Sequence, residues 1–371
     1  MSARQRPTVL LLIPHLGGGG SEQVIEALAR SFDPTKYSIH LGLITAAGER
    51  VKPFPSTVLV HQLRASRVRI GAFKLLRLVW QLKPDLIFSG ISHLNLLVLA
   101  LKPLLPRSTR IIVRQNGALR ASLNCYPRSV SRRAHSLGYR RADRVICQSE
   151  PMAREIRRCL AVDQSRLLIL PNPTNIARFR NHGLSKYEPV ASLPTLLAVG
   201  RLVPEKGFDI LLHAFASLLD LPISARLTIV GEGPEARGLQ ELSEALGVSD
   251  RIEFAGHVHD PVLRFRHASV FVLSSRTEGL PNAMLEAAAA GLPIVATPAS
   301  LGVTSLLRNR KGVWLASEIT PNALRAAIEM ALTSVGPGVR YPHAWIEPFD
   351  LCHAIPAYEA AIDQVLAETI C

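Results

Sequence analysis

Cysteine and aromatic side chains are both scarce in this sequence. The 371 residues include five cysteines, an odd number, scattered without a C-x-x-C pair, and Phe, Trp and Tyr together make up 5%. Cysteines of this number and spacing argue against a disulfide framework and against a zinc site. We therefore expect a chain that works in the reducing cytoplasm.

Long apolar runs are absent as well. Val9 to Ile13 follows basic residues as a signal peptide would, but Pro14 ends the run well short of roughly 7 to 15 residues. Leu94 to Leu105 contains Lys102 and Pro103 and is shorter than the roughly 18 to 20 residues that span a bilayer. The sequence predicts neither a signal peptide nor a transmembrane helix.

Acidic metal-binding motifs are missing too. No D-x-D occurs, nor any cluster of His and Asp with metal-ligand spacing, so we expect no metal ion and no separate cofactor. The sequence also lacks a recognisable nucleic-acid module and an aromatic stacking platform, which argues against nucleic acid as a partner.

Positive charge is in excess, and it is placed unevenly. The net charge is +14; residues 1–190 carry 30 Lys and Arg against 10 Asp and Glu, whereas residues 191–371 carry 13 against 19. A field of that sign concentrates anionic partners such as acidic lipid headgroups, phosphorylated acceptors or nucleic acid.

Two segments of the first half place this charge beside apolar residues. Residues 128–144 contain six arginines, and the basic residues of the segment 64–83 include Arg64, Arg67, Arg69, Lys74 and Arg77. Such a composition is typical of a peripheral membrane surface. An amphipathic helix whose basic face meets solvent is an equal alternative.

The order of apolar runs predicts an α/β fold with two domains. A single core seldom grows past roughly 250 to 300 residues, so a chain of this length favours two. Near-continuous apolar strands alternate with helices to about residue 173 and again from residue 194, as in parallel sheets covered on both faces. Residues 174–193 lose this periodicity, and we predict a linker there. The prediction is two doubly wound units.

Four glycines, Gly17 to Gly20, follow the first predicted strand and open a helix. Bare backbone N–H groups and the positive end of the helix dipole allow a phosphate or a sugar to approach closely. A flexible turn is the alternative.

Two cations follow the first predicted strand of the second domain. "VGRLVPEKG" places Arg201 at the strand end and Lys206 in the next loop. Ligands of open α/β sheets bind at the carboxyl ends of strands, and a fixed pair of cations there suits a diphosphate. Two solvated loop charges are the alternative.

A short glycine pattern offers a competing interpretation. "GEGPEA" matches the dinucleotide fingerprint G-x-G-x-x-A through Gly231, Gly233 and Ala236, with Glu253 about twenty residues on. The pattern follows the second strand of its domain, whereas the fingerprint belongs after the first. We therefore do not favour NAD binding.

Two glutamates flank a predicted helix start in "TEGLPNAMLEAAAAG". Pro281 suits the first turn and Asn282 the cap, with Glu278 in the loop ahead and Glu286 one turn inside. The helix N-terminus can hold a phosphate oxygen, while ionised carboxylates accept hydrogen bonds from sugar hydroxyls. This division fits a nucleoside diphosphate sugar; a helix stabilised by acidic residues is the alternative.

Taken in order with "ADRVICQSE", "LPNPTNIARF" and "IEFAGHV", these motifs resemble glycosyltransferase family 4. The similarity is clearest over residues 194–298, where R-x4-K precedes E-x7-E, and weaker over residues 8–180. The resemblance implies a retaining enzyme of the GT-B fold, with two Rossmann-like domains facing across a cleft. It implies an acceptor-binding domain at 1–180, a donor-binding domain at 181–345, and a final segment, 346–371, whose helix crosses back to the first domain.

The resemblance also implies roles for individual residues. Arg201 and Lys206 would neutralise the donor diphosphate, Glu286 would hold the ribose, and Glu278 would bind the hexose hydroxyls; Glu278, Arg201 and Lys206 form the expected catalytic set. Further donor contacts would come from Gly18, Gly19 and Gly20 and from Gly279, Leu280, Pro281, Asn282 and Ala283.

The sequence departs from the family pattern at two places. Ser305 stands where a glutamate is expected after the "VAT" strand, and Gln115 and Asn116 stand where a histidine near the reacting sugar is frequent. The first departure puts a contact near the phosphate or uracil in doubt. The second gives no support to a protein general base.

The function that follows is transfer of a hexose or N-acetylhexosamine from a nucleotide diphosphate sugar to a glycan or lipid-linked acceptor. We expect a UDP-sugar, with GDP-mannose as an alternative, and a place in the synthesis of envelope polysaccharide, lipopolysaccharide or glycolipid. The basic first domain predicts peripheral attachment to an anionic membrane, on the cytoplasmic face of the inner membrane. A nucleotide-sugar epimerase of the same fold, or a non-catalytic protein that binds anions or nucleic acid, remains as an alternative.

Overall fold

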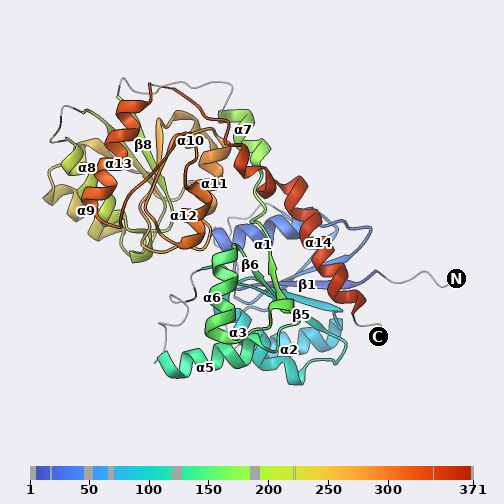
Figure 1. Cartoon of the computed structure of the whole chain (residues 1–371). Helices are drawn as coiled ribbons and strands as arrows, with labels where there is room; N and C mark the ends of the chain where they lie inside the picture. The colour runs from blue at the N-terminus through green and yellow to red at the C-terminus, as the bar shows by residue number, and fades with distance from the viewer. Residues whose placement is uncertain are drawn as a thin grey trace. The chain divides into compact units, whose positions relative to one another are not determined.

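The computed structural model describes residues 6–16, 19–45, 53–65, 71–117, 119, 128–183, 193–219, 221, 223–336 and 338–368. The chain divides into two compact units. Unit 1 consists of Met1–Pro173 together with Leu351–Cys371, and unit 2 of Thr174–Asp350. Helices cover both faces of a parallel sheet in each unit (Figure 1).

Unit 1 is built on a seven-stranded parallel sheet of order β3-β2-β1-β4-β5-β6-β7 within the described residues. Its strands are β1 Thr8–Ile13, β2 Ser38–Leu43, β3 Val58–Gln62, β4 Leu86–Ser89, β5 Arg110–Arg114, β6 Arg144–Cys147 and β7 Leu167–Ile169. Its helices are α1 Gly20–Ser31, α2 Gly71–Leu82, α3 Ser92–Leu101, α5 Arg128–Tyr139, α6 Glu150–Leu160 and α14 Leu351–Ala367, with short 3-10 turns at Lys102–Leu104 and Gln164–Arg166.

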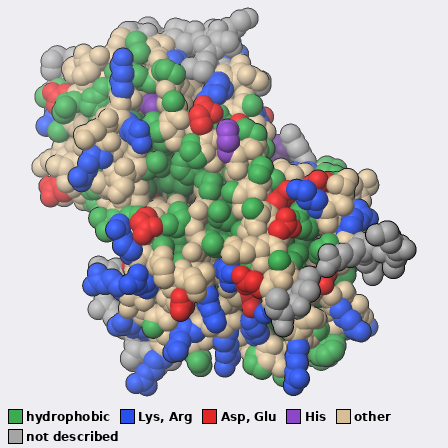
Figure 2. All heavy atoms as spheres, turned by 45° about the vertical axis from the view of Figure 1, so that its right-hand side comes forward, with side chains coloured by type: hydrophobic (Ala, Val, Ile, Leu, Met, Phe, Trp, Pro, Cys, Tyr) green, Lys and Arg blue, Asp and Glu red, His purple; other side chains and the backbone are tan. Residues whose placement is uncertain are grey.

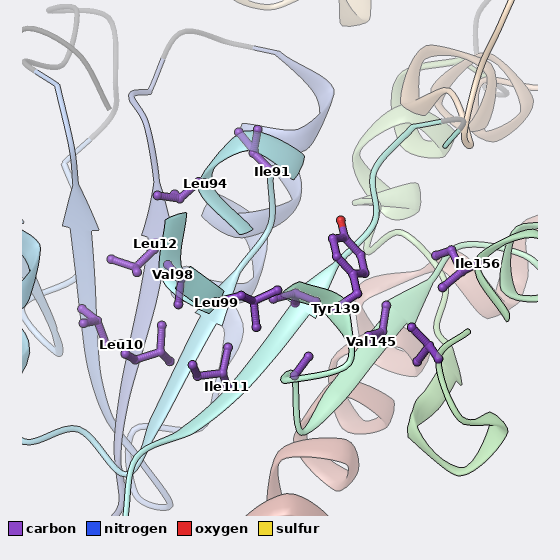
Figure 3. Packing of buried hydrophobic residues seen from close by; sticks show 14 of the residues in the cluster. Leu10, Leu12, Ile91, Leu94, Val98, Leu99, Ile111, Tyr139, Val145 and Ile156 are labelled. Atoms are coloured by element: carbon purple, nitrogen blue, oxygen red, sulfur yellow. The ribbon is translucent and has the colours of Figure 1, made fainter. Parts of the chain in front are cut away.

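The sheet of unit 1 separates two apolar layers. Helices α2, α3, α5 and α6 pack on one face, where Leu10 and Ile111 from the strands meet Val98 from α3 (Figure 3). Helices α1 and α14 pack on the other face, where the rings of Phe88 and Tyr358 lie 6.0 Å apart. Burial on both faces explains why these strands are continuous apolar runs.

Unit 2 is built on a six-stranded parallel sheet of order β10-β9-β8-β11-β12-β13, again within the described residues. Its strands are β8 Thr195–Val199, β9 Arg226–Val230, β10 Ile252–Phe254, β11 Val270–Leu273, β12 Ile294–Ala296 and β13 Val313–Leu315. Its helices are α7 Ile176–Gly183, α8 Phe208–Leu219, α9 Ala236–Ala245, α10 Val262–His267, α11 Asn282–Ala289, α12 Leu301–Leu307 and α13 Pro321–Ser334, with 3-10 turns at Pro204–Lys206, Ser249–Arg251 and Ala344–Phe349.

The strand order reverses once in each sheet. In unit 1, β1 lies between β2 and β4, and in unit 2, β8 lies between β9 and β11. At such a point the connections that follow two neighbouring strands run in opposite directions. This opens a crevice at the carboxyl ends of the two strands, where ligands bind in α/β folds. The loops after β8 and β11 therefore define the first place to look for a site.

The ends of unit 2 differ from the sequence prediction. Part of the predicted linker is the helix α7, whose Ile176 and Phe179 are buried with residues of α10 and α11. Unit 2 therefore begins at Thr174, earlier than the predicted boundary at residue 181. At the other end Ile346 and Phe349 are buried in the same cluster, so unit 2 extends past the predicted boundary at residue 345.

The C-terminal helix α14 groups with unit 1. The carboxylate of Glu359 accepts hydrogen bonds from the backbone N–H of Asp33 and from the ammonium of Lys36, both at 2.9 Å. Among the described residues, no helix combines the length and apolar character needed to cross a membrane.

Candidate functional site

The loops after β8 and β11 approach each other through a glycine. A 3-10 turn, Pro204–Lys206, follows β8 and ends at Gly207, whose φ of +61° lies in the left-handed region. A Cβ atom at Gly207 would lie 2.3 Å from the carbonyl oxygen of Ser274, directly after β11. Only glycine satisfies both the backbone angle and the close approach.

Lys206 and Glu278 meet at this junction. The Lys206 ammonium lies 2.5 Å from Glu278 Oε1, and the hydroxyl of Ser275 donates to the same oxygen at 2.7 Å. The two charged side chains are 26% and 11% exposed, so solvent screens the pair only in part. The hydroxyl of Ser274 donates to the carbonyl of Lys206 at 2.9 Å and fixes the lysine backbone.

The loop that follows β12 also contacts this site. Buried Thr297 donates through its hydroxyl to the carbonyl of Ser275 at 2.6 Å, and the N–H of Glu278 donates to Ala299 O at 3.3 Å. Arg276 forms a two-pronged contact with the Asp209 carboxylate, at 2.7 and 2.5 Å. These contacts hold Glu278 in a defined position before any ligand arrives.

Arg201 follows β8 after the single residue Gly200, at the same edge of the sheet. Its side chain is exposed, and within the described part of the chain no hydrogen bond or ion pair engages its guanidinium. The structure therefore brings Lys206 and Glu278 into contact but leaves Arg201 facing solvent. An exposed cation at the strand end remains available to an anionic ligand.

Glu286 lies on α11, one turn from its start, and is partly buried. Burial raises the pKa of its carboxyl to about 7; the positive charge of Arg178 lowers this pKa and the negative charge of Asp260 raises it. Arg178 of α7 and Asp260 form an ion pair of 2.6 Å. Sequence reasoning missed both residues because their proximity to Glu286 depends on the packing of α7 against α11.

The start of α11 differs from the predicted cap. Pro281 is the N-cap residue, in extended conformation, and Asn282 is the first residue of the helix. The N–H that proline lacks is not needed at this position, because the N–H groups at a helix start have no partner within the helix. The preceding Gly279 and Leu280 are buried with Pro281, whereas Asn282 and Ala283 are partly buried.

The glycine pattern of the competing NAD hypothesis has a structural explanation. A Cβ at Gly231 would lie 1.9 Å from the carbonyl oxygen of Gly200, and a Cβ at Gly233 would lie 2.2 Å from that of Leu202. These glycines are needed for the loops after β9 and β8 to pack together. Glu253 lies on β10 and forms an ion pair with an arginine of α10.

In unit 1 the corresponding loops follow β1, β4 and β5. Of the predicted glycines, Gly18 lies outside the described residues; Gly19 is the N-cap of α1 and Gly20 its first residue. The amide of Asn116 donates to the Ser21 hydroxyl at 2.5 Å and accepts from the Ser92 hydroxyl at 3.1 Å. Asn116, at the place of the expected histidine, thus links the loop after β5 to the first turns of α1 and α3.

The other two departures from the family pattern are at Gln115 and Ser305. Gln115 is buried and accepts a hydrogen bond of 2.6 Å from the hydroxyl of Tyr139. Ser305 is exposed on α12. Across the described ranges, no group of three or more His, Cys, Asp or Glu side chains is arranged to hold a metal ion.

Two doubly wound parallel-sheet units, the second with a charged pair at its switch point, define the GT-B class of fold. Solved structures share this fold over nearly the whole chain. The sucrose-phosphate synthase of Thermosynechococcus elongatus matches with a TM-score of 0.84 at 17% identity, over 98% of this chain and all of that one (100%). HepE of Anabaena, solved in complex with UDP and glucose, matches with a TM-score of 0.78 at 17% identity, over 96% and 99% of the two chains. The predicted GT-B fold is confirmed.

Family models place the sequence within this class. The model for Glycosyltransferase Family 4 matches residues 18–178, and the model for Glycosyl transferases group 1 matches residues 185–347. The chain belongs to glycosyltransferase family 4.

Curated relatives match over part of their length. The D-inositol 3-phosphate glycosyltransferase of Geodermatophilus obscurus is 30% identical over 248 residues, 61% of this chain and 54% of that protein. The lipopolysaccharide core biosynthesis glycosyltransferase LpsE of Rhizobium meliloti is 31% identical over 193 residues, 52% and 53% of the two chains. The chain spans about half the length of these relatives.

Proposed function

We propose that the protein is a retaining hexosyltransferase that uses a nucleoside diphosphate sugar, most favourably a UDP-sugar, and a glycan or lipid-linked acceptor. The observation that carries this proposal is the Lys206–Glu278 pair at the switch point of unit 2. A cation and a carboxylate held together match the diphosphate and hydroxyl groups of such a donor. The name of one relative, a lipopolysaccharide core biosynthesis glycosyltransferase, supports the acceptor class.

The chemistry centres on the leaving diphosphate. As the bond between the anomeric carbon and the phosphate oxygen breaks, negative charge develops on the diphosphate, and Lys206 and Arg201 stabilise it. Preorganised charges do this best because they need no rearrangement at the moment of reaction. Glu278, which the Ser275 hydroxyl holds, keeps the Lys206 ammonium in place, and the N-terminus of α11 contributes its positive dipole.

The acceptor attacks from the side on which the diphosphate departs. A bond forms between the acceptor oxygen and the anomeric carbon, and the acceptor proton passes to the leaving phosphate oxygen. This route retains the configuration and needs no protein nucleophile. It suits a chain that carries Asn116 at the place of the expected histidine, because the amide of Asn116 is occupied by two serine hydroxyls.

Glu286 completes the donor site at the other end of the nucleotide. Its carboxylate, when ionised, accepts hydrogen bonds from the ribose hydroxyls. Because the pKa is about 7, the group is largely ionised only above neutral pH unless a ligand stabilises the charge.

The acceptor side is proposed to meet an anionic membrane on its cytoplasmic face. Helix α2 exposes Phe73 (75%) and Trp80 (51%) next to exposed Lys74 and Arg77. Figure 2 shows Lys and Arg side chains gathered over the face of unit 1 that it displays. Apolar rings beside cations are the composition of an interfacial helix. Of the basic residues expected here, Arg67 and Arg69 lie outside the described residues.

The configuration of the product tests the reaction. The protein would be incubated with α-linked UDP-sugars or GDP-mannose and a membrane glycolipid extract, and the new anomeric proton read by NMR. An α-linked product, with release of the nucleoside diphosphate and equal rates with or without EDTA, agrees with a metal-independent retaining transferase. A β-linked product, or conversion of the donor to its epimer without transfer, contradicts the proposal.

A further inference from the structure

A pocket of about 430 Å³ opens at the other edge of the unit 1 sheet, where strands begin. Arg140 follows α5, Arg157 lies in the last turn of α6, and Arg166 immediately precedes β7. The loops that follow β1, β4 and β5 lie at the opposite edge of this sheet. The pocket is lined by Arg140, Arg157, Ala161, Val162, Asp163 and Arg166.

The lining carries an excess of positive charge. Three arginines face one carboxylate, that of Asp163. Its Oδ1 accepts hydrogen bonds of 2.8 Å from both the N–H and the hydroxyl of Ser165, which lower the pKa of the carboxyl. Over the described part of the chain, no ion pair within 4 Å joins these arginines to a carboxylate. All four charged side chains of the lining are exposed. The lining carries about two more positive than negative charges, a match for the charge of a phosphomonoester.

Two of the guanidinium groups are held in place. Arg166 Nη1 donates to the carbonyl oxygens of Arg140, at 2.7 Å, and Ala142, at 3.3 Å. Arg157 Nη1 donates to Gln164 Oε1 at 3.4 Å. Each contact engages one nitrogen, so the remaining N–H groups can bind phosphate oxygens in the forked geometry that arginine favours.

A simpler explanation accounts for two of the three arginines, because Arg140 and Arg157 both stand at helix C-termini. A cation in the last turn of a helix interacts favourably with the negative end of the helix dipole, and Arg157 and Arg158 both satisfy this at α6. Arg140, directly after α5, is placed in the same way, whereas Arg166 precedes β7 on a separate segment. Helix ends do not by themselves require that arginines from three segments line one pocket, and an anionic ligand accounts for that convergence.

We propose that this arginine pocket binds a phosphomonoester group. Two sources share that chemistry: a soluble phosphate ester, and the headgroup of phosphatidic acid in a membrane. The site is independent of the transferase assignment, because it lies at the strand-start edge and its test measures binding rather than transfer.

The test compares two variants with the same change in charge. Arg140→Gln with Arg157→Gln alters the pocket, whereas Arg154→Gln with Arg158→Gln removes two exposed arginines of α6 outside its lining. Calorimetry with inorganic phosphate and glycerol 3-phosphate, at constant ionic strength, measures the soluble source. Sedimentation with vesicles of phosphatidic acid, against vesicles of phosphatidylcholine, measures the lipid source. Melting temperatures check that both variants fold.

We expect the pocket variant to weaken phosphate binding by about tenfold or more, the effect of losing charge-assisted hydrogen bonds, and the α6 variant to retain it. If only the pocket variant fails to sediment with phosphatidic acid vesicles, the lipid is the source of the phosphomonoester. If both variants still sediment with the vesicles while the pocket variant no longer binds soluble phosphate, the soluble ester is the source. Absence of phosphate binding by the unaltered protein, or equal losses in both variants, overturns the proposal.

Discussion

Lys206 and Glu278, 72 residues apart in the sequence, are joined by a 2.5 Å contact between the ammonium and a carboxylate oxygen. They meet because β8 and β11 are neighbours at the point where the strand order of unit 2 reverses. A donor diphosphate that binds Lys206 must therefore share it with Glu278. The two residues should respond differently to substitution.

Lys206→Ala should weaken binding of the nucleoside diphosphate by about tenfold, because a partly desolvated charge contact is lost. Glu278→Gln should maintain this affinity or increase it several-fold, since Lys206 then lacks its competing carboxylate. Transfer by Glu278→Gln should still fall by about a hundredfold, as expected when an interaction of the reacting sugar is lost. Calorimetry with UDP and a turnover assay separate the two effects. Equal losses of affinity in both variants would contradict a shared lysine.

Glu286 makes stability depend on pH. Its pKa rises from 4.5 in the unfolded chain to about 7 in the folded one, so between these values the folded state holds more protons. Stability therefore falls as pH rises through this window, and the cost is complete above about pH 7. Glu286→Gln removes the cost, and its gain in unfolding free energy should be about 2 kcal/mol larger at pH 8 than at pH 5.

Denaturant unfolding at the two pH values measures this gain. Glu244→Gln, at an exposed position of α9, is the matched control, and its effect on the unfolding free energy relative to the unaltered protein should be the same at both pH values. A gain for Glu286→Gln that does not vary with pH would show that the carboxyl is not held in a desolvated place.

Gly207→Ala should destabilise unit 2 and weaken donor binding. The left-handed φ and the approach to Ser274 O each oppose a Cβ, so the cost should be roughly 2 kcal/mol or more. Gly238→Ala, on α9 with no atom within 4 Å of the added Cβ, should instead stabilise by about 0.5 to 1 kcal/mol. Thermal unfolding with and without UDP compares them; similar melting temperatures for the two variants would exclude a tight junction at Gly207.

Phe73→Ser with Trp80→Ser should reduce attachment to vesicles of anionic lipid. Each ring loses its apolar burial in the interface, and together about a tenfold loss is expected. Met330→Ser, at an exposed apolar position of α13 in unit 2, should sediment like the unaltered protein. Retention that depends on salt but not on the two rings would assign attachment to charge alone.

Much of the fold follows from the sequence because its strands are buried on both faces. Near-continuous apolar runs can be recognised as strands in the sequence, as at Thr8–Ile13 and Val270–Leu273. β3 was not predicted, since it is an edge strand in which only Val58 is buried. The short, polar α7 was interpreted as linker because Ile176 and Phe179 are too few to reveal its buried face.

The candidate site is harder to predict than the fold. The carboxyl-end rule found Lys206, and the predicted helix start found Glu278. The carboxyl-end rule could also have found Ser275, which follows β11 closely. Their direct contact could not be predicted, because the adjacency of β8 and β11 is a property of the strand order. The same holds for Arg178 and Asp260 beside Glu286, which depend on helix packing.

The central claim is that the switch point of unit 2 binds a nucleoside diphosphate. Calorimetric titration with UDP, GDP, ADP and NAD, for the unaltered protein and for Lys206→Ala, tests it most directly. The account predicts that one nucleoside diphosphate binds, UDP foremost, and that Lys206→Ala weakens this binding by about tenfold. Preferential binding of NAD, or binding of UDP that is indifferent to the loss of Lys206, would contradict it.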